Sequence, residues 1–164
     1  MDESKGFTLL ELVVTVAIIA LLLSIATLLY SQLNMKYQVE STIKEIYGTM
    51  IKMRNDAALS NTPHLVLFNA NQVLAGRDAD DNGAIDGAPI STINTGFTVN
   101  CGVPPAIATC AGFTVTFNRR GIPNNLQTVS LAIPANVPSS LNCISIAVTR
   151  INIGRFEGGN CVQQ

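Results

Sequence analysis

The hydrophobic pattern of this chain changes twice, which divides it into an apolar run, an amphipathic helix and a series of short strands. The apolar run covers residues 7–30, and positions 12–29 within it carry no charged side chain. A helix of about 24 residues spans about 36 Å, enough to cross a hydrocarbon core of about 30 Å. The pattern therefore predicts a transmembrane helix over residues 7–30.

Beyond the apolar run, the helical pattern continues as a single apolar stripe. Apolar side chains recur three or four positions apart, so that they share one face of a helix. The stripe consists of Val39, Ile43, Ile46, Met50, Met53 and Ala57. Pro63 is expected to stop the helix, because the residue before a proline avoids the α region. Residues 31–62 are therefore predicted to form the amphipathic half of one long helix.

After Pro63 the alternation changes to a period of two residues, which is typical of strands. The first and last pairs of these strands are expected to form hairpins. The prediction is an α+β fold, with one antiparallel sheet or two small sheets packed against the helix as a head domain over residues 63–164. Strands are expected at residues 64–68, 72–74, 96–100, 112–117, 128–133, 143–149 and 151–156.

The charge and the cysteines narrow the class of protein. The 164 residues carry a formal net charge of −1, which excludes a global basic field that would attract nucleic acid or anionic lipid. Four cysteines behind an apparent export segment indicate two disulfides in an oxidising compartment. Three pairings are open. We favour the local pairs Cys101–Cys110 and Cys143–Cys161, because each closes a short loop. The alternative is a zinc site, which is disfavoured because the sequence has no CxxC pair.

One carboxylate lies close to the start of the apolar run. Glu11 would cost roughly 2.5–3.5 kcal/mol on insertion scales if it lay deep in a bilayer, so its position needs a reason. Lys5 precedes the run and favours a cytoplasmic N-terminus. A cleaved secretory signal is the alternative, but it requires a shorter apolar core and a small-residue cleavage site, and no A-x-A-like site closes this run.

Residues 5–14, KGFTLLELVV, resemble the processing and assembly motif of type IV pilins and type II secretion pseudopilins. The resemblance implies that a prepilin peptidase cuts between Gly6 and Phe7, removes a leader of residues 1–6 and methylates the new amine. It also implies an assembly role for Glu11, whose carboxylate can meet the amine of a neighbouring subunit. We therefore expect a single-pass protein of the bacterial inner membrane with a periplasmic head, which joins other pilins or pseudopilins in a filament.

Weaker motifs extend the resemblance over most of the chain. The helix end at 53–58, the turn at 117–121 and the pair Gly154-Arg155 are similar to those of GspH/FimT-type minor pseudopilins and minor pilins. The resemblance leaves a type II secretion system and a type IV pilus open.

Some members of that family bind DNA, which gives nucleic acid as an alternative partner. About four phosphate contacts would bind weakly and with a strong salt dependence, so solvated arginines at strand ends are the favoured interpretation. The arginines concerned are Arg119, Arg120, Arg150 and Arg155.

The acidic loop at residues 77–87 is the second distinctive motif. Asp78, Asp80, Asn82 and Asp86 fit the first, third, fifth and ninth positions of a D-x-[DN]-x-[DN]-G calcium loop. Pro89 stands where that motif has a bidentate glutamate, so a calcium site would lack two oxygens. The alternative is an Asx-rich turn whose side chains bond the local backbone. Calcium is the one candidate cofactor.

The sequence contains no recognisable catalytic motif. His64 directly follows Pro63 and has no evident nucleophile or carboxylate partner. No G-x-S-x-G elbow, Gly-rich phosphate loop or H-E-x-x-H pattern occurs. We therefore expect a structural protein rather than an enzyme.

Overall fold

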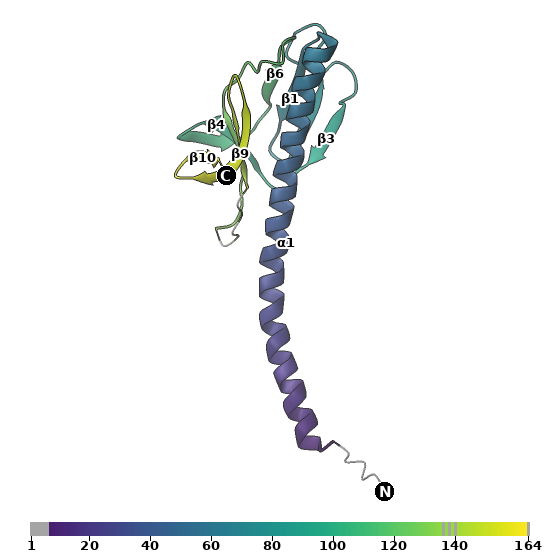
Figure 1. Cartoon of the computed structure of the whole chain (residues 1–164), viewed down its shortest axis with the longest axis vertical. Helices are drawn as coiled ribbons and strands as arrows, with labels where there is room; N and C mark the ends of the chain where they lie inside the picture. Colours follow the sequence, from purple (N-terminus) through teal and green to yellow (C-terminus); the bar gives the residue numbers. More distant parts are fainter. Residues whose placement is uncertain (1–6, 136, 138, 140, 164) are drawn as a thin grey trace.

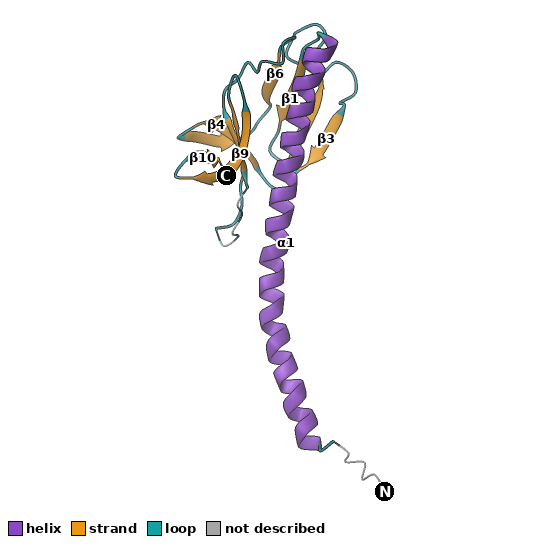
Figure 2. Ribbon diagram, viewed as in Figure 1, coloured by secondary structure: helices purple, strands orange, loops and turns teal. Residues whose placement is uncertain are grey.

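A single long helix carries two antiparallel sheets at its C-terminal half, which is the predicted α+β fold (Figure 1 and Figure 2). The structure is a computed structural model that describes residues 7–135, 137, 139 and 141–163, without the side chains of residues 25–29. The predicted leader, including Gly6, lies outside the described residues. The described chain begins at the far end of the helix, and the C-terminus lies on the head (Figure 1).

Helix α1 (Leu9–Ser60) runs for 52 residues, and both of its ends have a local cause. Thr8 is the extended N-cap, and its hydroxyl accepts a hydrogen bond of 3.2 Å from the backbone N of Glu11. Thr8 and Glu11 have the spacing of a capping box, and the negative charge of an acidic residue in the first turn interacts favourably with the helix dipole. At the other end Asn61 takes the left-handed conformation (φ 51°) immediately before the Thr62-Pro63 pair, where the chain leaves the helix.

The predicted apolar stripe is confirmed as the side of α1 that packs on the head. All six of its residues, from Val39 to Ala57, have no exposed surface. They contact β1, β2, β3 and β6 of one sheet and β8 and β9 of the other, so α1 joins the two sheets into one core. Each fully buried apolar side chain contributes roughly 1.5–3 kcal/mol, so this stripe is a principal source of head stability.

The first sheet has four strands in the order β3-β2-β1-β6. The predicted early hairpin is present, with Phe68 opposite Val73 across the turn. β1 also pairs with β6, so it lies between β2, which follows it directly in the chain, and a strand that comes much later. The strands are β1 (His64–Phe68), β2 (Gln72–Arg77), β3 (Ser91–Asn94) and β6 (Phe113–Phe117).

The second sheet has six strands in the order β10-β9-β8-β7-β4-β5. The two disulfides lie in this sheet. Cys101–Cys110 joins β4 to the residue that follows β5, and Cys143–Cys161 joins β8 to β10 across the intervening β9. These are the local pairs that the sequence favoured. The strands are β4 (Val99–Val103), β5 (Ala106–Thr109), β7 (Thr128–Leu131), β8 (Cys143–Ile146), β9 (Ile151–Glu157) and β10 (Asn160–Gln163).

The strand predictions differ from the structure in extent. The strand expected at 96–100 begins only at Val99, because Gly96 has a left-handed φ of 63° and the Thr95 hydroxyl donates to the Phe97 carbonyl in a turn. The strand expected at 143–149 ends at Ile146, where Ala147 bonds Arg150 in a tight turn. β3, β5 and β10, of four residues each, were not predicted.

Candidate assembly and processing site

Of the expected processing and assembly residues, the structure describes Phe7 and Glu11, and both lie at the N-terminal end of α1. Phe7 is 80% exposed, and the exposed Glu11 stands in the first helical turn. The ion pairs found among the described residues are Lys36–Glu40 and Arg155–Glu157. Within the described part of its own chain, the exposed carboxylate of Glu11 therefore has no basic partner.

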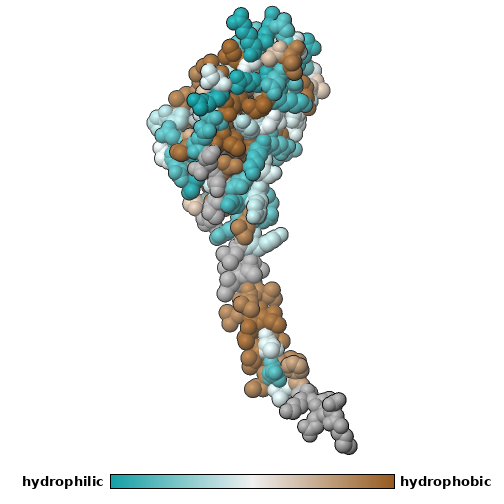
Figure 3. Space-filling view, in the orientation of Figure 1, coloured by the Kyte–Doolittle hydropathy of each residue, from teal (hydrophilic) through white to brown (hydrophobic). Residues whose placement is uncertain are grey.

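The N-terminal part of α1 also presents apolar side chains that the head does not cover. The space-filling view shows an apolar band on the visible face of the lower helix, interrupted by a small hydrophilic patch and separate from the mixed surface of the head (Figure 3). An exposed apolar surface of this extent marks an interaction with protein or lipid. The residues of this band, each 49–83% exposed, are Phe7, Leu9, Leu10, Leu12, Val13, Val14, Val16, Ile18, Ile19, Leu21, Leu22 and Leu23.

The comparison with protein families agrees with this geometry. The family model of the prokaryotic N-terminal methylation motif matches residues 1–27. The comparisons with curated proteins and with solved structures found no match. The match and the long N-terminal helix support a type IV pilin-like protein, in which the motif implies processing by prepilin peptidase and assembly with other pilins.

The match also suggests membrane anchoring through the N-terminal segment. Among the residues that the structure describes, which leave out the side chains of residues 25–29 inside the predicted span, no helix has the length and apolar character needed to cross a membrane. The transmembrane helix expected over residues 7–30 therefore stays a prediction.

The arginines that sequence analysis grouped together fall into two places. Arg119 and Arg120 stand in the turn after β6, where the Asn118 side chain accepts hydrogen bonds from the backbone N of Arg120 and of Ile122. Gly121 has a φ of 72°, and a Cβ there would lie 2.9 Å from the carbonyl oxygen of Arg54. The turn therefore packs directly against the last part of α1.

Arg54 links this turn to a second one. Its guanidinium donates a 3.2 Å hydrogen bond to the carbonyl of Thr149, next to Arg150 in the turn between β8 and β9. Arg119, Arg120 and Arg150 thus belong to turns that both contact Arg54. Sequence reasoning missed Arg54 as the residue that joins them, although it stood in the quoted helix end.

Arg155 lies apart from these turns, toward the other end of β9. Its Nε atom is 2.9 Å from the Oε1 atom of Glu157, so its charge is already paired. The preceding Gly154 is buried opposite Cys143 on one side and Gln163 on the other. A Cβ at Gly154 would overlap the carbonyl oxygen of Val162, so the glycine permits the close pairing of β9 with β10.

The acidic loop follows β2 and is ordered by its own side chains. Asp78 is fully buried, and its two carboxylate oxygens accept from the backbone N of Asn82 (2.9 Å) and of Gly83 (3.0 Å). Asp86 accepts from the backbone N of Ala79. This is the Asx-turn arrangement that sequence analysis gave as the alternative.

The same loop brings together the carboxylates named for calcium. Ligand atoms of Asp78, Asp80 and Asp86 lie within 4.8 Å of one another. Asn82 directs its side chain to its neighbours instead, donating to Asp80 and accepting from the Ala84 backbone N. Calcium binding stays a prediction, and it requires a melting temperature that rises when calcium is added to the wild-type chain.

Replacement of Asp78 by alanine is expected to destabilise the head by about 2–4 kcal/mol, because it removes two charge-assisted hydrogen bonds from a buried carboxylate. Thermal unfolding of the full chain in detergent measures the loss. Asp80→Ala is the matched control, since Asp80 is exposed and should change stability by less than about 1 kcal/mol. Equal losses in the two variants would show that the buried carboxylate does not organise the loop.

His64 is placed as a structural residue. It is 5% exposed, and its Nδ1 atom lies 2.9 Å from the carbonyl oxygen of Thr62, to which a protonated Nδ1 donates. The contact ties the start of β1 to the chain that leaves α1.

Proposed function

We propose that this protein is a minor pseudopilin or minor pilin of the GspH/FimT type, a structural subunit of a type II secretion or type IV pilus filament. Prepilin peptidase cuts between Gly6 and Phe7 and methylates the Phe7 amine. The subunit is held in the bacterial inner membrane by residues 7–30 before assembly, with the head in the periplasm. It then leaves the lipid to join other pilins or pseudopilins.

The observation that carries this proposal is the division of α1 into two halves with different surroundings. The half that begins at Val39 buries its apolar stripe on the head, whereas the large apolar side chains between Phe7 and Leu23 are exposed. Removing such a surface from water stabilises by roughly 25 cal/mol per Å², so lipid or neighbouring helices are its favourable surroundings. A filament supplies the second of these.

Glu11 would set the axial register between neighbouring subunits in the filament. A buried carboxylate without a partner is costly, and pairing with a cation makes its burial tolerable. The new amine of Phe7 in a neighbouring subunit is such a cation. The cost of an unpaired Glu11 would therefore favour the register in which each Glu11 meets an amine of the next subunit.

The alternative function is a minor pilin whose head captures DNA for uptake. The contact of Arg54 with both turns that carry Arg119, Arg120 and Arg150 favours it, and the pairing of Arg155 with Glu157 speaks against it. A gel shift with the full chain at low and at physiological salt distinguishes the two functions. Binding kept at physiological salt and lost in Arg120→Ala would favour the alternative over a purely structural role.

The processing step is tested by co-expression with a prepilin peptidase. We expect a mature chain that begins at Phe7 and is one methyl group heavier than the unmodified peptide, because the peptidase methylates the amine it releases. Mass spectrometry of the N-terminal peptide measures both changes. Gly6→Val serves as the uncleavable control. A wild-type chain that keeps residues 1–6 beside an active peptidase would contradict the proposal.

A further inference from the structure

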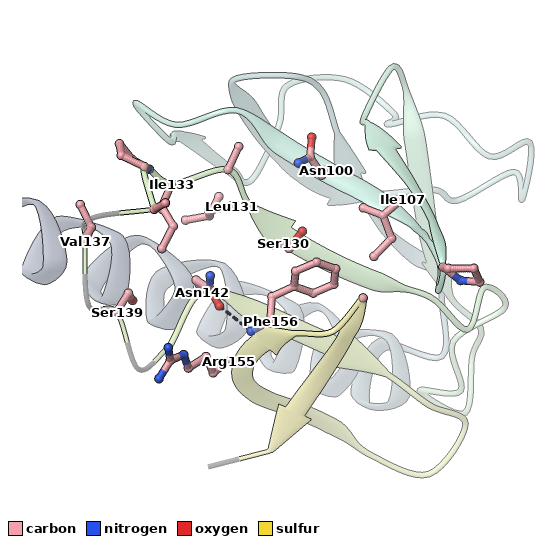
Figure 4. A pocket seen from close by; sticks show the side chains of 15 residues that line it. Asn100, Ile107, Ser130, Leu131, Ile133, Val137, Ser139, Asn142, Arg155 and Phe156 are labelled. Atoms are coloured by element: carbon pink, nitrogen blue, oxygen red, sulfur yellow. Dashed lines mark hydrogen bonds between the residues drawn. The ribbon is translucent and has the colours of Figure 1, made fainter.

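A pocket of about 480 Å³ opens on the face of the second sheet that is turned away from α1 (Figure 4). Its floor is formed by Asn100 on β4 and Ser130 on β7, which stand opposite each other in the sheet register. Ile107 on β5 and Phe156 on β9 line its sides. Small-molecule sites have volumes of about 300–1,000 Å³, so this pocket lies within their range.

The pocket presents hydrogen-bonding groups that the protein itself leaves open. Ser130 is 3% exposed, yet its hydroxyl makes no hydrogen bond within the described residues. Every fully enclosed side-chain oxygen or nitrogen among these residues has a partner, so the Ser130 hydroxyl, which has none among them, retains a small accessible surface. Among the described residues, the side chain of Asn142, 7% exposed, makes one hydrogen bond, in which its Oδ1 atom accepts from the backbone N of Phe156 at 2.7 Å. Its amide NH₂ group has no acceptor among these residues and is the donor that it offers to a ligand.

An aromatic ring lies beside these polar groups. Phe156 is half-buried, and its ring lies near Ser130 and Asn142 on the pocket side of the sheet (Figure 4). A flat apolar ring next to hydroxyl and amide groups suits a ligand that has one apolar face and a rim of hydroxyls. A pyranose sugar has this construction.

The position in the sheet argues against an extended peptide. Peptides that bind sheets add a strand to an open edge, where main-chain hydrogen bonds supply the affinity. β4 and β7 are interior strands with a partner on each side, and the open edges of this sheet are β5 and β10. A ligand at the pocket floor must therefore be bound by side chains rather than by main-chain hydrogen bonds. Carbohydrates can be bound in this way.

The charge of the pocket argues against an anionic ligand or a catalytic site. Arg155 reaches the rim, but its guanidinium is paired with Glu157. None of the described lining residues is an aspartate, glutamate, histidine or cysteine. Hydrolysis of a glycosidic bond requires a pair of carboxylates, so the lining suits binding without cleavage.

We propose that this pocket is a binding site for a neutral carbohydrate, which Asn100, Ser130 and Asn142 hold by hydrogen bonds while Phe156 stacks on the apolar face of the sugar. On a filament subunit, such a site would give the exposed head a ligand of its own. The proposal does not depend on processing or assembly, so its test stands or falls separately from the proposed function.

The test is saturation-transfer NMR on the full chain in a detergent without a sugar headgroup, because maltoside detergents would occupy the pocket. The probes are glucose, galactose, mannose, fucose, N-acetylglucosamine and N-acetylgalactosamine, each as the free sugar and as a disaccharide. We expect at least one probe to bind with a Kd below about 10 mM, a range typical of single weak sites. No binding by any probe at that concentration would overturn the proposal.

Point variants locate the bound sugar. Asn100→Ala and Ser130→Ala should each weaken binding about tenfold, since each removes a hydrogen bond to the ligand. Asn152→Ala is the matched control, because Asn152 lies on β9 outside the pocket lining and should bind sugar as the wild type does. Melting temperatures check that each variant is folded.

Three further results would contradict a carbohydrate site here. Binding that survives both Asn100→Ala and Ser130→Ala would place the sugar elsewhere. An equal loss in Asn152→Ala would show a general effect on the sheet. Saturation transfer to an extended Gly-Ser peptide, but to none of the sugars, would identify a peptide groove instead.

Discussion

Replacement of Glu11 by alanine is expected to abolish incorporation into the filament while membrane insertion stays intact or improves. In the membrane the carboxylate is a cost of roughly 2.5–3.5 kcal/mol at depth, so its removal favours insertion. In the filament it is the partner of a neighbouring amine, and breaking a buried ion pair costs about 3–5 kcal/mol. That loss corresponds to more than about a hundredfold weaker assembly. Immunoblots of sheared filaments and of membranes measure the two effects separately.

The N-terminal cap provides a control for this experiment. Glu11 also stands in the first turn behind the Thr8 cap, at the capping-box position, so alanine removes a side chain suited to the helix end as well as a charge, although it keeps the backbone N–H that donates to Thr8. Glu11→Gln retains a side chain that can complete a capping box but carries no charge. We expect Glu11→Gln to assemble as poorly as Glu11→Ala. Assembly restored by glutamine would show that Glu11 acts through the helix end, and the ion-pair account would be wrong.

The second large effect is expected from Gly154→Ala, which should destabilise the head by about 2–4 kcal/mol. The added methyl group would overlap the carbonyl oxygen of Val162, so β10 must move away from β9. The strands are also held by Cys143–Cys161, which limits how far they can separate. Thermal unfolding of the full chain in detergent measures the loss.

Arg155→Ala is the matched control for the Gly154-Arg155 motif. Arg155 is exposed, and its pairing with the equally exposed Glu157 should contribute less than about 1 kcal/mol. A large loss of stability in Gly154→Ala and a small one in Arg155→Ala would show that the glycine, and not the arginine, is needed for the fold. A stable Gly154→Ala protein would falsify the packing explanation of this motif.

The long helix was predictable because its pattern is strong and its causes are local. The stripe from Val39 to Ala57 has a regular period, and every one of its residues is fully buried. The stop before Pro63 follows from the geometry of proline. The Thr8 cap was not predicted, because Thr8 and Glu11 stand inside the apolar run, which carries no polar boundary to mark a helix start.

The short edge strands were not predictable from their sequences. β5 and β10 are mostly exposed, so they have no buried face to impose an alternating pattern. β3 buries mainly Ile93 among polar neighbours. Such strands form because a longer neighbour offers a hydrogen-bonding edge, and a sequence window of four residues does not contain that neighbour.

The candidate sites also differ in how far they could be predicted from the sequence. The processing motif is contiguous, so residues 5–14 could be interpreted directly from the sequence. The carbohydrate pocket combines Asn100, Ser130 and Phe156, which come from three strands and meet only through the register of the sheet. The separation of Arg155 from the other arginines likewise depends on the tertiary fold, which brings the turn after β6 and the turn between β8 and β9 together at Arg54 and leaves Arg155 further along β9.

The central claim is that this chain is a filament subunit whose N-terminal helix is processed and packed among other pilins. The most direct test is mass spectrometry of purified filaments from cells that express the chain at its natural level. The account predicts an N-terminal peptide of this protein that begins at methylated Phe7, together with peptides of its head. Filaments that contain none of these peptides, while the chain stays in the membrane in mature form, would contradict it.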